Sequence, residues 1–168
     1  MMRPWVLVSV LLLAGCGGGG ARTGPDVGSS SSIECAPFAR QVSGIQLYGD
    51  AAAWWDQADG RYDRGTDPVQ GGVLVFRRSG RLPSGHVSVV ARLVSSREIH
   101  VTQANWVHHR ITRDEPVVDV SAGNDWSRVK VWWAPSNTLG STVYSTYGFI
   151  VPDRARSRRD LVAGLQDP

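Results

Sequence analysis

Hydrophobic and polar positions follow three successive patterns along this chain of 168 residues. An apolar run over residues 5–13 comes first, and residues 17–32 are then almost entirely Gly, Ser, Pro, Thr and isolated charges. From Ile33 onward the apolar positions recur at helical spacing and later at the twofold spacing typical of strands. The patterns therefore predict a leader, a polar connection and one folded domain, which the chain length also favours.

Two helices are expected at the start of the domain. The first covers residues 35–42, with Ser32 as its N-cap and Gly44 after its end. Asp50 is placed to cap a second helix over residues 51–58.

The remainder of the domain shows the alternation typical of β-strands. Residues 60–72 contain several Gly and no apolar period, which indicates a loop. Strands are expected after it over residues 73–76, 86–93, 98–103, 117–120, 127–133 and 147–151. Helices followed by strands with short turns indicate an α+β fold with an antiparallel sheet.

The first 15 residues have the form of a secretory signal. Arg3 precedes the apolar run, small residues follow it, and the run is shorter than the roughly 20 residues of a membrane span. Residues 13–16, Leu-Ala-Gly-Cys, resemble a bacterial lipobox. The resemblance implies that residues 1–15 are a lipoprotein signal peptide and that Cys16 receives lipid. The protein would then be anchored in the cell envelope, at the outer membrane and periplasm of a Gram-negative cell or otherwise on the outer face of the plasma membrane.

The mature chain divides into three segments. Residues 16–32 hold the lipidated cysteine and a Gly/Ser-rich stretch that buries too little apolar surface to fold, so we expect a flexible tether. Residues 33–152 form the domain, and residues 153–168 form a basic polar tail. Loss of Arg3 leaves 17 of the 18 basic side chains against 15 acidic ones. With no basic stripe interleaved with aromatics, nucleic acid is not an expected partner.

Cysteine, histidine and amide side chains are spaced for nucleophilic catalysis. A cysteine nucleophile needs a base, a group that orients the base, and donors for the oxyanion. Cys35 opens the first expected helix, where free N–H groups favour the thiolate, and lipidation of Cys16 leaves it without a disulfide partner. His86 begins a strand, while Gln103 and Asn105 end an otherwise apolar strand face where an amide can orient an imidazole.

The same residue types also have purely structural interpretations. A free cysteine is often a small buried apolar residue. His108 and His109 are adjacent and would point apart in a strand, and no second cysteine is free to join them. We therefore expect surface histidines, with no metal and no cofactor.

Four blocks of sequence, in this order, resemble the CHAP domain family. They are residues 34–40 (ECAPFAR), 68–76 (PVQGGVLVF), 85–90 (GHVSVV) and 103–106 (QANW). The family resembles NlpC-type and papain-like cysteine hydrolases, which implies a papain-like α+β fold with N-terminal helices packed on a curved antiparallel sheet. Its members cleave amide or peptide bonds of peptidoglycan, and a minority cleave amides of small thiol conjugates.

Carried over to this chain, the resemblance makes Cys35 the nucleophile, His86 the general base and then acid, and Asn105 the orienting residue. Two positions depart from the family pattern. Many members have an acidic residue where Gln103 stands, and many have Gln where Glu34 stands. Gln103 can accept an imidazole N–H but cannot stabilise imidazolium by charge, and the Glu34 carboxylate would repel an oxyanion.

The resemblance implies a monomeric cysteine hydrolase, a peptidoglycan amidase or endopeptidase that acts through a thioester. Two other functions stay open. Glu34 and Gln103 favour a peptidoglycan-binding lipoprotein that keeps the groove without turnover. A small-molecule amidase is the third hypothesis, and it would need a closed pocket instead of an open groove.

Overall fold

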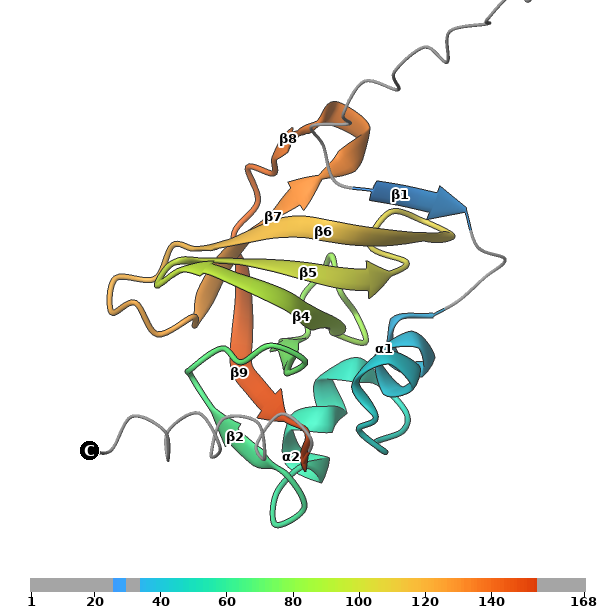
Figure 1. The fold of residues 1–168 in the computed structure, drawn as a ribbon, viewed down its shortest axis with the longest axis vertical. Coiled ribbons are helices and arrows are strands. Elements are labelled where there is room, and N and C mark those ends of the chain that lie inside the picture. The colour runs from blue at the N-terminus through green and yellow to red at the C-terminus, as the bar shows by residue number, and fades with distance from the viewer. Residues whose placement is uncertain (1–25, 30–33, 154–168) are drawn as a thin grey trace, which may run out of the picture.

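Antiparallel strands are the predominant secondary structure of the computed structural model, which describes residues 26–29 and 34–153 (Figure 1). The first elements are β1 (Asp26–Ser29), α1 (Cys35–Ser43), the 3-10 helix η1 (Ala51–Ala53), α2 (Trp54–Gln57), β2 (Asp63–Gly65) and β3 (Val73–Phe76). They are followed by β4 (His86–Ser95), β5 (Glu98–Ala104), β6 (Arg110–Asp119), β7 (Arg128–Trp133), the 3-10 helix η2 (Ala134–Ser136), β8 (Thr138–Leu139) and β9 (Tyr144–Val151).

Six of these strands close into a barrel. Their order is β6, β5, β4, β3, β9 and β7, and β7 pairs back to β6 through the Val117–Val131 register. The remaining strands lie on its margins, since β1 pairs with β6, β2 with β9 and β8 with β7. The closed ring satisfies the backbone hydrogen bonds of its strands without leaving a long exposed edge.

The predicted papain-like α+β fold, with helices packed on a curved sheet, is wrong, because the sheet closes on itself and helices are few. The sequence placed the fourth strand at residues 117–120, whereas β6 begins at Arg110. Residues 110–116 include Arg113, Asp114 and Glu115, so they lack the apolar alternation that marks a strand. The longer β6 reaches both β5 and β7, and these two pairings complete the ring.

The two expected helices have different outcomes. The first is confirmed as α1, and Gly44 ends it in the left-handed conformation with a φ of 80°. Its N-cap residue is Glu34 and not Ser32. The second is wrong as a continuous helix, because η1 and the four-residue α2 stand in its place, and Asp50 makes no side-chain cap bond there.

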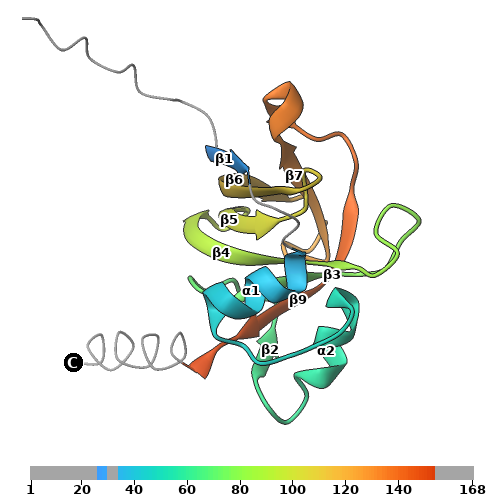
Figure 2. The ribbon, with the colours of Figure 1, turned by 90° about the vertical axis from the view of Figure 1, so that its right-hand side faces the viewer.

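Alternate residues of β3 and β4 face two separate cores. Val73, Val75, Val87 and Val89 pack with the helical segments, and the cluster also contains Leu47, Trp54 and Ile150. Leu74, Phe76 and Val90 fill the barrel, and the cluster also contains Ile99, Val101, Val117, Trp126 and Phe149. Figure 2 shows α1 and α2 below β4, at the end of the molecule opposite β7. This alternation directs His86 and Ser88 toward the barrel and Val87 toward α1.

Several sequence predictions concern residues that the structure does not describe. The signal peptide (residues 1–15), the lipidated Cys16 and residues 154–168 of the polar tail lie outside the described part of the chain. Within the segment predicted as a tether, β1 pairs with residues 110–113 of β6. No described helix has both the length and the apolar character that a membrane crossing requires.

Gly85 allows the turn before His86 to pack against η1. Its φ is 72°, and a Cβ at this position would lie 2.6 Å from the Cβ of Ala52. We expect Gly85→Ala to lower the free energy of unfolding by about 2–4 kcal/mol, since it combines left-handed strain with overpacking. Gly80→Ala is the matched control, because no atom lies within 4 Å of its Cβ position. Chemical denaturation of both variants checks this, and equal unfolding free energies would contradict it.

Candidate active site

Cys35 is the first residue of α1, and its half-buried thiol packs beside the first strand residues of β4. Burial raises the pKa of the thiol above its ordinary value, and the nearby charge of Glu34 raises it further. Hydrogen bonds from backbone N–H groups lower the pKa of the thiol, but burial outweighs them. The donors are Val87 in β4 and, at the start of the helix, Ala36 and Cys35. The thiol is therefore protonated near neutral pH and would need a base in order to act as a nucleophile.

His86 begins β4 and is 4% exposed. Its ring packs against Phe76, with ring centroids 5.5 Å apart, and against Trp106, with centroids 5.0 Å apart. Burial among these rings lowers the pKa of His86 to about 4, and the bond to Gln103 opposes this shift. The imidazole is therefore neutral at pH 7 and can accept a proton.

Gln103 is the side chain that meets this imidazole. Its Oε1 lies 2.9 Å from Nε2 of His86 and also accepts a hydrogen bond from Oγ of Ser88. A carbonyl oxygen only accepts, so Nε2 of His86 carries the hydrogen and Nδ1 carries the lone pair. Gln103, a secondary candidate in the sequence, is thus the residue whose side chain could orient His86 if His86 acts as a base.

The side chain of Asn105 forms hydrogen bonds with residues other than His86. Asn105 follows the end of β5 with a φ of 61°, and its Nδ2 donates to Oε2 of Glu34 over 2.9 Å. Its Oδ1 accepts from the backbone N–H of His109. The structure therefore brings Asn105 together with Glu34, and within the described ranges no hydrogen bond joins it to His86. The strand face predicted from residues 99, 101 and 103 ends where β5 ends.

Glu115 extends the buried polar cluster and was missed by the sequence analysis. Its Oε2 accepts from Nε2 of Gln103 over 2.5 Å and from Oγ1 of Thr112 over 2.6 Å. The exposed fractions of Gln103, Thr112 and Glu115 are all 0%. A glutamate among charged residues and beside Pro116 has the pattern of a solvent-facing position, so no sequence signal marks it.

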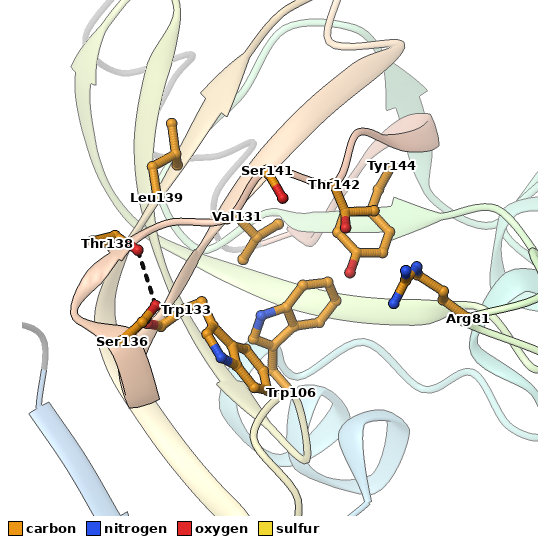
Figure 3. Close-up of a pocket in the computed structure, with 11 residues that line it drawn as sticks. Arg81, Trp106, Val131, Trp133, Ser136, Thr138, Leu139, Ser141, Thr142 and Tyr144 are labelled. Atoms are coloured by element: carbon orange, nitrogen blue, oxygen red, sulfur yellow. Dashed lines mark hydrogen bonds between the residues drawn. The ribbon is translucent and has the colours of Figure 1, made fainter.

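A pocket of about 390 Å³ is lined by Trp106, Val131 and Tyr144 (Figure 3). The ring of Trp106 packs against both His86 and Tyr144, with centroids 5.0 Å apart in each pair. Trp133 and Arg81 also line the pocket, together with the hydroxyl side chains of Ser136, Thr138, Ser141 and Thr142. No described carboxylate forms an ion pair with Arg81, so its charge is available to a ligand.

A second polar cluster lies on the outside of the barrel. Asp114 accepts from Nε of Arg92 over 2.6 Å and lies 2.8 Å from Nδ1 of His100, which also approaches Glu98. These contacts hold Asp114 in place from the solvent side. Within residues 26–29 and 34–153, no three His, Cys, Asp or Glu side chains gather in a way that could hold a metal ion.

Replacing His86 with Gln should flatten the dependence of stability on pH. Below about pH 6.5 an unfolded histidine takes up a proton, whereas folded His86 stays neutral down to about pH 4. The unfolded state binds more protons in this window, so the unfolding free energy of the wild type decreases as pH falls from about 6.5 to 4, by about 3 kcal/mol from this group. Urea titrations at stepped pH check this, and identical pH slopes for both proteins would contradict it.

Comparison with known families agrees with the ordered blocks of sequence. The family model of the CHAP domain matches residues 25–105, which include Cys35, His86 and Gln103. The comparison with curated proteins gave no match. CHAP domains are generally amidases or peptidases. The match thus identifies a CHAP domain over residues 25–105 of this chain.

Proposed function

We propose that this protein is a cell-envelope cysteine amidohydrolase or endopeptidase that cleaves amide or peptide bonds of peptidoglycan. The observation that carries the proposal is the buried hydrogen bond of 2.9 Å between Nε2 of His86 and Oε1 of Gln103. It leaves Nδ1 of His86 as a base at the start of β4, where the thiol of Cys35 lies at the backbone N–H of Val87. Membership in a family of peptidoglycan-directed amidases supports the substrate class.

In the proposed reaction, the Cys35 sulfur attacks the carbonyl carbon while its proton passes to Nδ1 of His86. The resting pair is neutral, because burial raises the pKa of the thiol and lowers the pKa of the imidazole. The imidazolium then protonates the leaving amine, which breaks the C–N bond and leaves a thioester. His86 next deprotonates a water that attacks the thioester, and the acid departs as the thiol is restored.

The start of α1 supplies the donors that we assign to the oxyanion. The N–H groups of Cys35 and Ala36 lie next to the thiol, as their effect on its pKa requires. Such donors are preorganised by the helix and stabilise the charge that develops on the carbonyl oxygen. The Glu34 carboxylate is held by Asn105, so a fixed hydrogen bond limits its approach to that oxygen.

The pocket beside Trp106 is the proposed site for the part of the substrate next to the scissile bond. Aromatic faces of Trp106 and Trp133 suit sugar rings and apolar side chains, and the hydroxyl groups around them suit amides and sugar hydroxyls. Arg81 would pair with a carboxylate of the peptide stem.

The envelope location is part of the same proposal. Cleavage before Cys16 and lipidation of that residue would place the domain beside a membrane, within reach of the wall. The Gly-rich composition of residues 17–25 suits a connection between the anchor and the domain.

Cys35→Ala should abolish the release of soluble fragments from purified sacculi. The wild-type protein is expected to release fragments whose masses identify the bond, because only the thiol can form the thioester. Mass spectrometry of the soluble fraction measures this, and pelleting with sacculi shows that the variant still binds. Binding without release by the wild type would favour a peptidoglycan-binding lipoprotein. If the wild type neither releases fragments nor binds sacculi, the result would favour a small-molecule amidase.

Arg81→Ala should weaken the use of substrates that carry a stem carboxylate. We expect kcat/KM for a soluble muropeptide to fall by about tenfold, since a hydrogen-bonded ion pair is lost. The difference should vanish for a muropeptide whose carboxylates are amidated. Arg128→Ala, an exposed arginine of β7 that does not line the pocket, is the matched control. An equal loss of kcat/KM in both variants, or with both substrates, would show that Arg81 does not bind a substrate carboxylate.

A further inference from the structure

We propose that Glu115 is a positioning residue that sets the tautomer of His86 through the side-chain amide of Gln103. This inference rests on the proposed function, since it concerns the base of the same reaction. Glu115 belongs to β6 and does not contact His86; it acts through the amide that lies between them.

A glutamine side chain alone does not determine the tautomer of a histidine. Its two ends have nearly the same shape, and the amide can rotate by 180° to offer either an oxygen or an NH₂ group. If the NH₂ group faced Nε2 of His86, that nitrogen would have to accept, and the hydrogen would move to Nδ1. Nδ1 could then take no proton from Cys35, and the thiol would lose its base.

The carboxylate of Glu115 selects one of these two orientations. Its Oε2 accepts a hydrogen bond of 2.5 Å from Nε2 of Gln103, which directs Oε1 of Gln103 toward His86. Ser88 donates to the same Oε1 and so supports the same orientation. Donor and acceptor roles are therefore consistent from Glu115 to Nε2 of His86, and the lone pair is left on Nδ1.

A bulge in β6 directs Glu115 into the barrel. Val101 pairs with Glu115 and Gln103 pairs with Thr112, so Arg113 and Asp114 together lie opposite the single residue 102, and β6 has one extra residue here. Asp114 takes a φ of 56°, a strained conformation for a residue with a side chain. In a regular strand, residues 112 and 115 would face opposite sides, whereas here both are fully buried beside Gln103.

Arg92 and His100 hold the outer side of this bulge through Asp114. The strand thus keeps a strained turn that places a carboxyl group inside the protein. Bulges of this kind commonly re-aim a side chain next to an active site.

The carboxyl group is costly at this position, which argues that it has a task. Its Oε1 is buried without a hydrogen-bond partner among the described residues, and burial raises the pKa of Glu115. A proton on this free Oε1 would leave Oε2 as an acceptor for Gln103, so the orienting role survives either protonation state. A purely structural position would be filled at lower cost by an apolar side chain.

Two variants separate this role from a structural one. Glu115→Leu removes the acceptor, so His86 should lose its uniform Nε2–H tautomer and hydrolysis should fall by about 10²- to 10⁴-fold, as expected for a base in the wrong tautomer. Gln103→Glu combined with Glu115→Gln exchanges the two groups. The new carboxylate at position 103 accepts from His86 in any orientation, so the exchange should keep the Nε2–H tautomer and restore hydrolysis to within about tenfold.

Long-range ¹H–¹⁵N NMR of the imidazole measures the tautomer, and muropeptide release measures hydrolysis. Thr112→Val is the control, since it removes the second donor to Glu115 but keeps the acceptor for Gln103, and it should leave the tautomer unchanged. If Glu115→Leu does not fold, the exchanged variant decides: loss of the Nε2–H tautomer there overturns the proposal. A folded Glu115→Leu protein with the wild-type tautomer also overturns it. If the tautomers follow the expectation but the wild type releases nothing, the proposed function fails and the role of Glu115 stands.

Discussion

The hydrogen bond between His86 and Gln103 is the constraint on which the site depends. An imidazole in an apolar setting keeps one orientation only if one of its nitrogens has a fixed partner, and Gln103 provides that partner from the neighbouring strand β5. The rings of Phe76 and Trp106 exclude water from the same imidazole. Because the barrel is closed, the two strands cannot separate to solvate the pair without disrupting the sheet.

Burial has opposite effects on the two partners of the reaction, and together they define the resting state. It disfavours the charged form of each group, so the pKa of Cys35 rises while the pKa of His86 falls. A preformed thiolate–imidazolium pair is therefore not the resting state. In the proposed mechanism, proton transfer therefore accompanies attack on the substrate, and the oxyanion would be stabilised at the helix start. Turnover is then a better measure of this site than alkylation of the thiol at neutral pH.

The sequence predicted those parts of the site that lie on regular elements. The alternation along residues 86–89 predicted that His86 and Ser88 share one face of the strand and that Val87 and Val89 share the other, as they do in the structure. The same rule placed Gln103 on the next strand, where its side chain contacts both His86 and Ser88. The rule failed for Asn105, because β5 ends one residue earlier and the chain turns with a positive φ.

The sequence could not predict the parts that depend on β6. In a regular strand, every second residue faces the same side. The bulge at Arg113 and Asp114 shifts this alternation by one residue, so the sequence pattern places Glu115 on the surface. The same charged segment hid the first half of β6, and with it the pairings that close the barrel. A fold class inferred from the visible strands alone was therefore wrong.

Gln103 stands where many CHAP domains have an acidic residue, and Glu115 provides a carboxyl group on the far side of its amide. A carboxylate in direct contact with His86 would stabilise imidazolium and raise the pKa of the ring. With an amide between them, the hydrogen bond and the orientation are kept while the charge is one residue further away, and the ring stays neutral with a pKa of about 4. A weaker base gives a more acidic imidazolium, which donates its proton more readily to a leaving amine. In the proposed mechanism, the amide of Gln103 thus favours protonation of the leaving amine over deprotonation of the thiol.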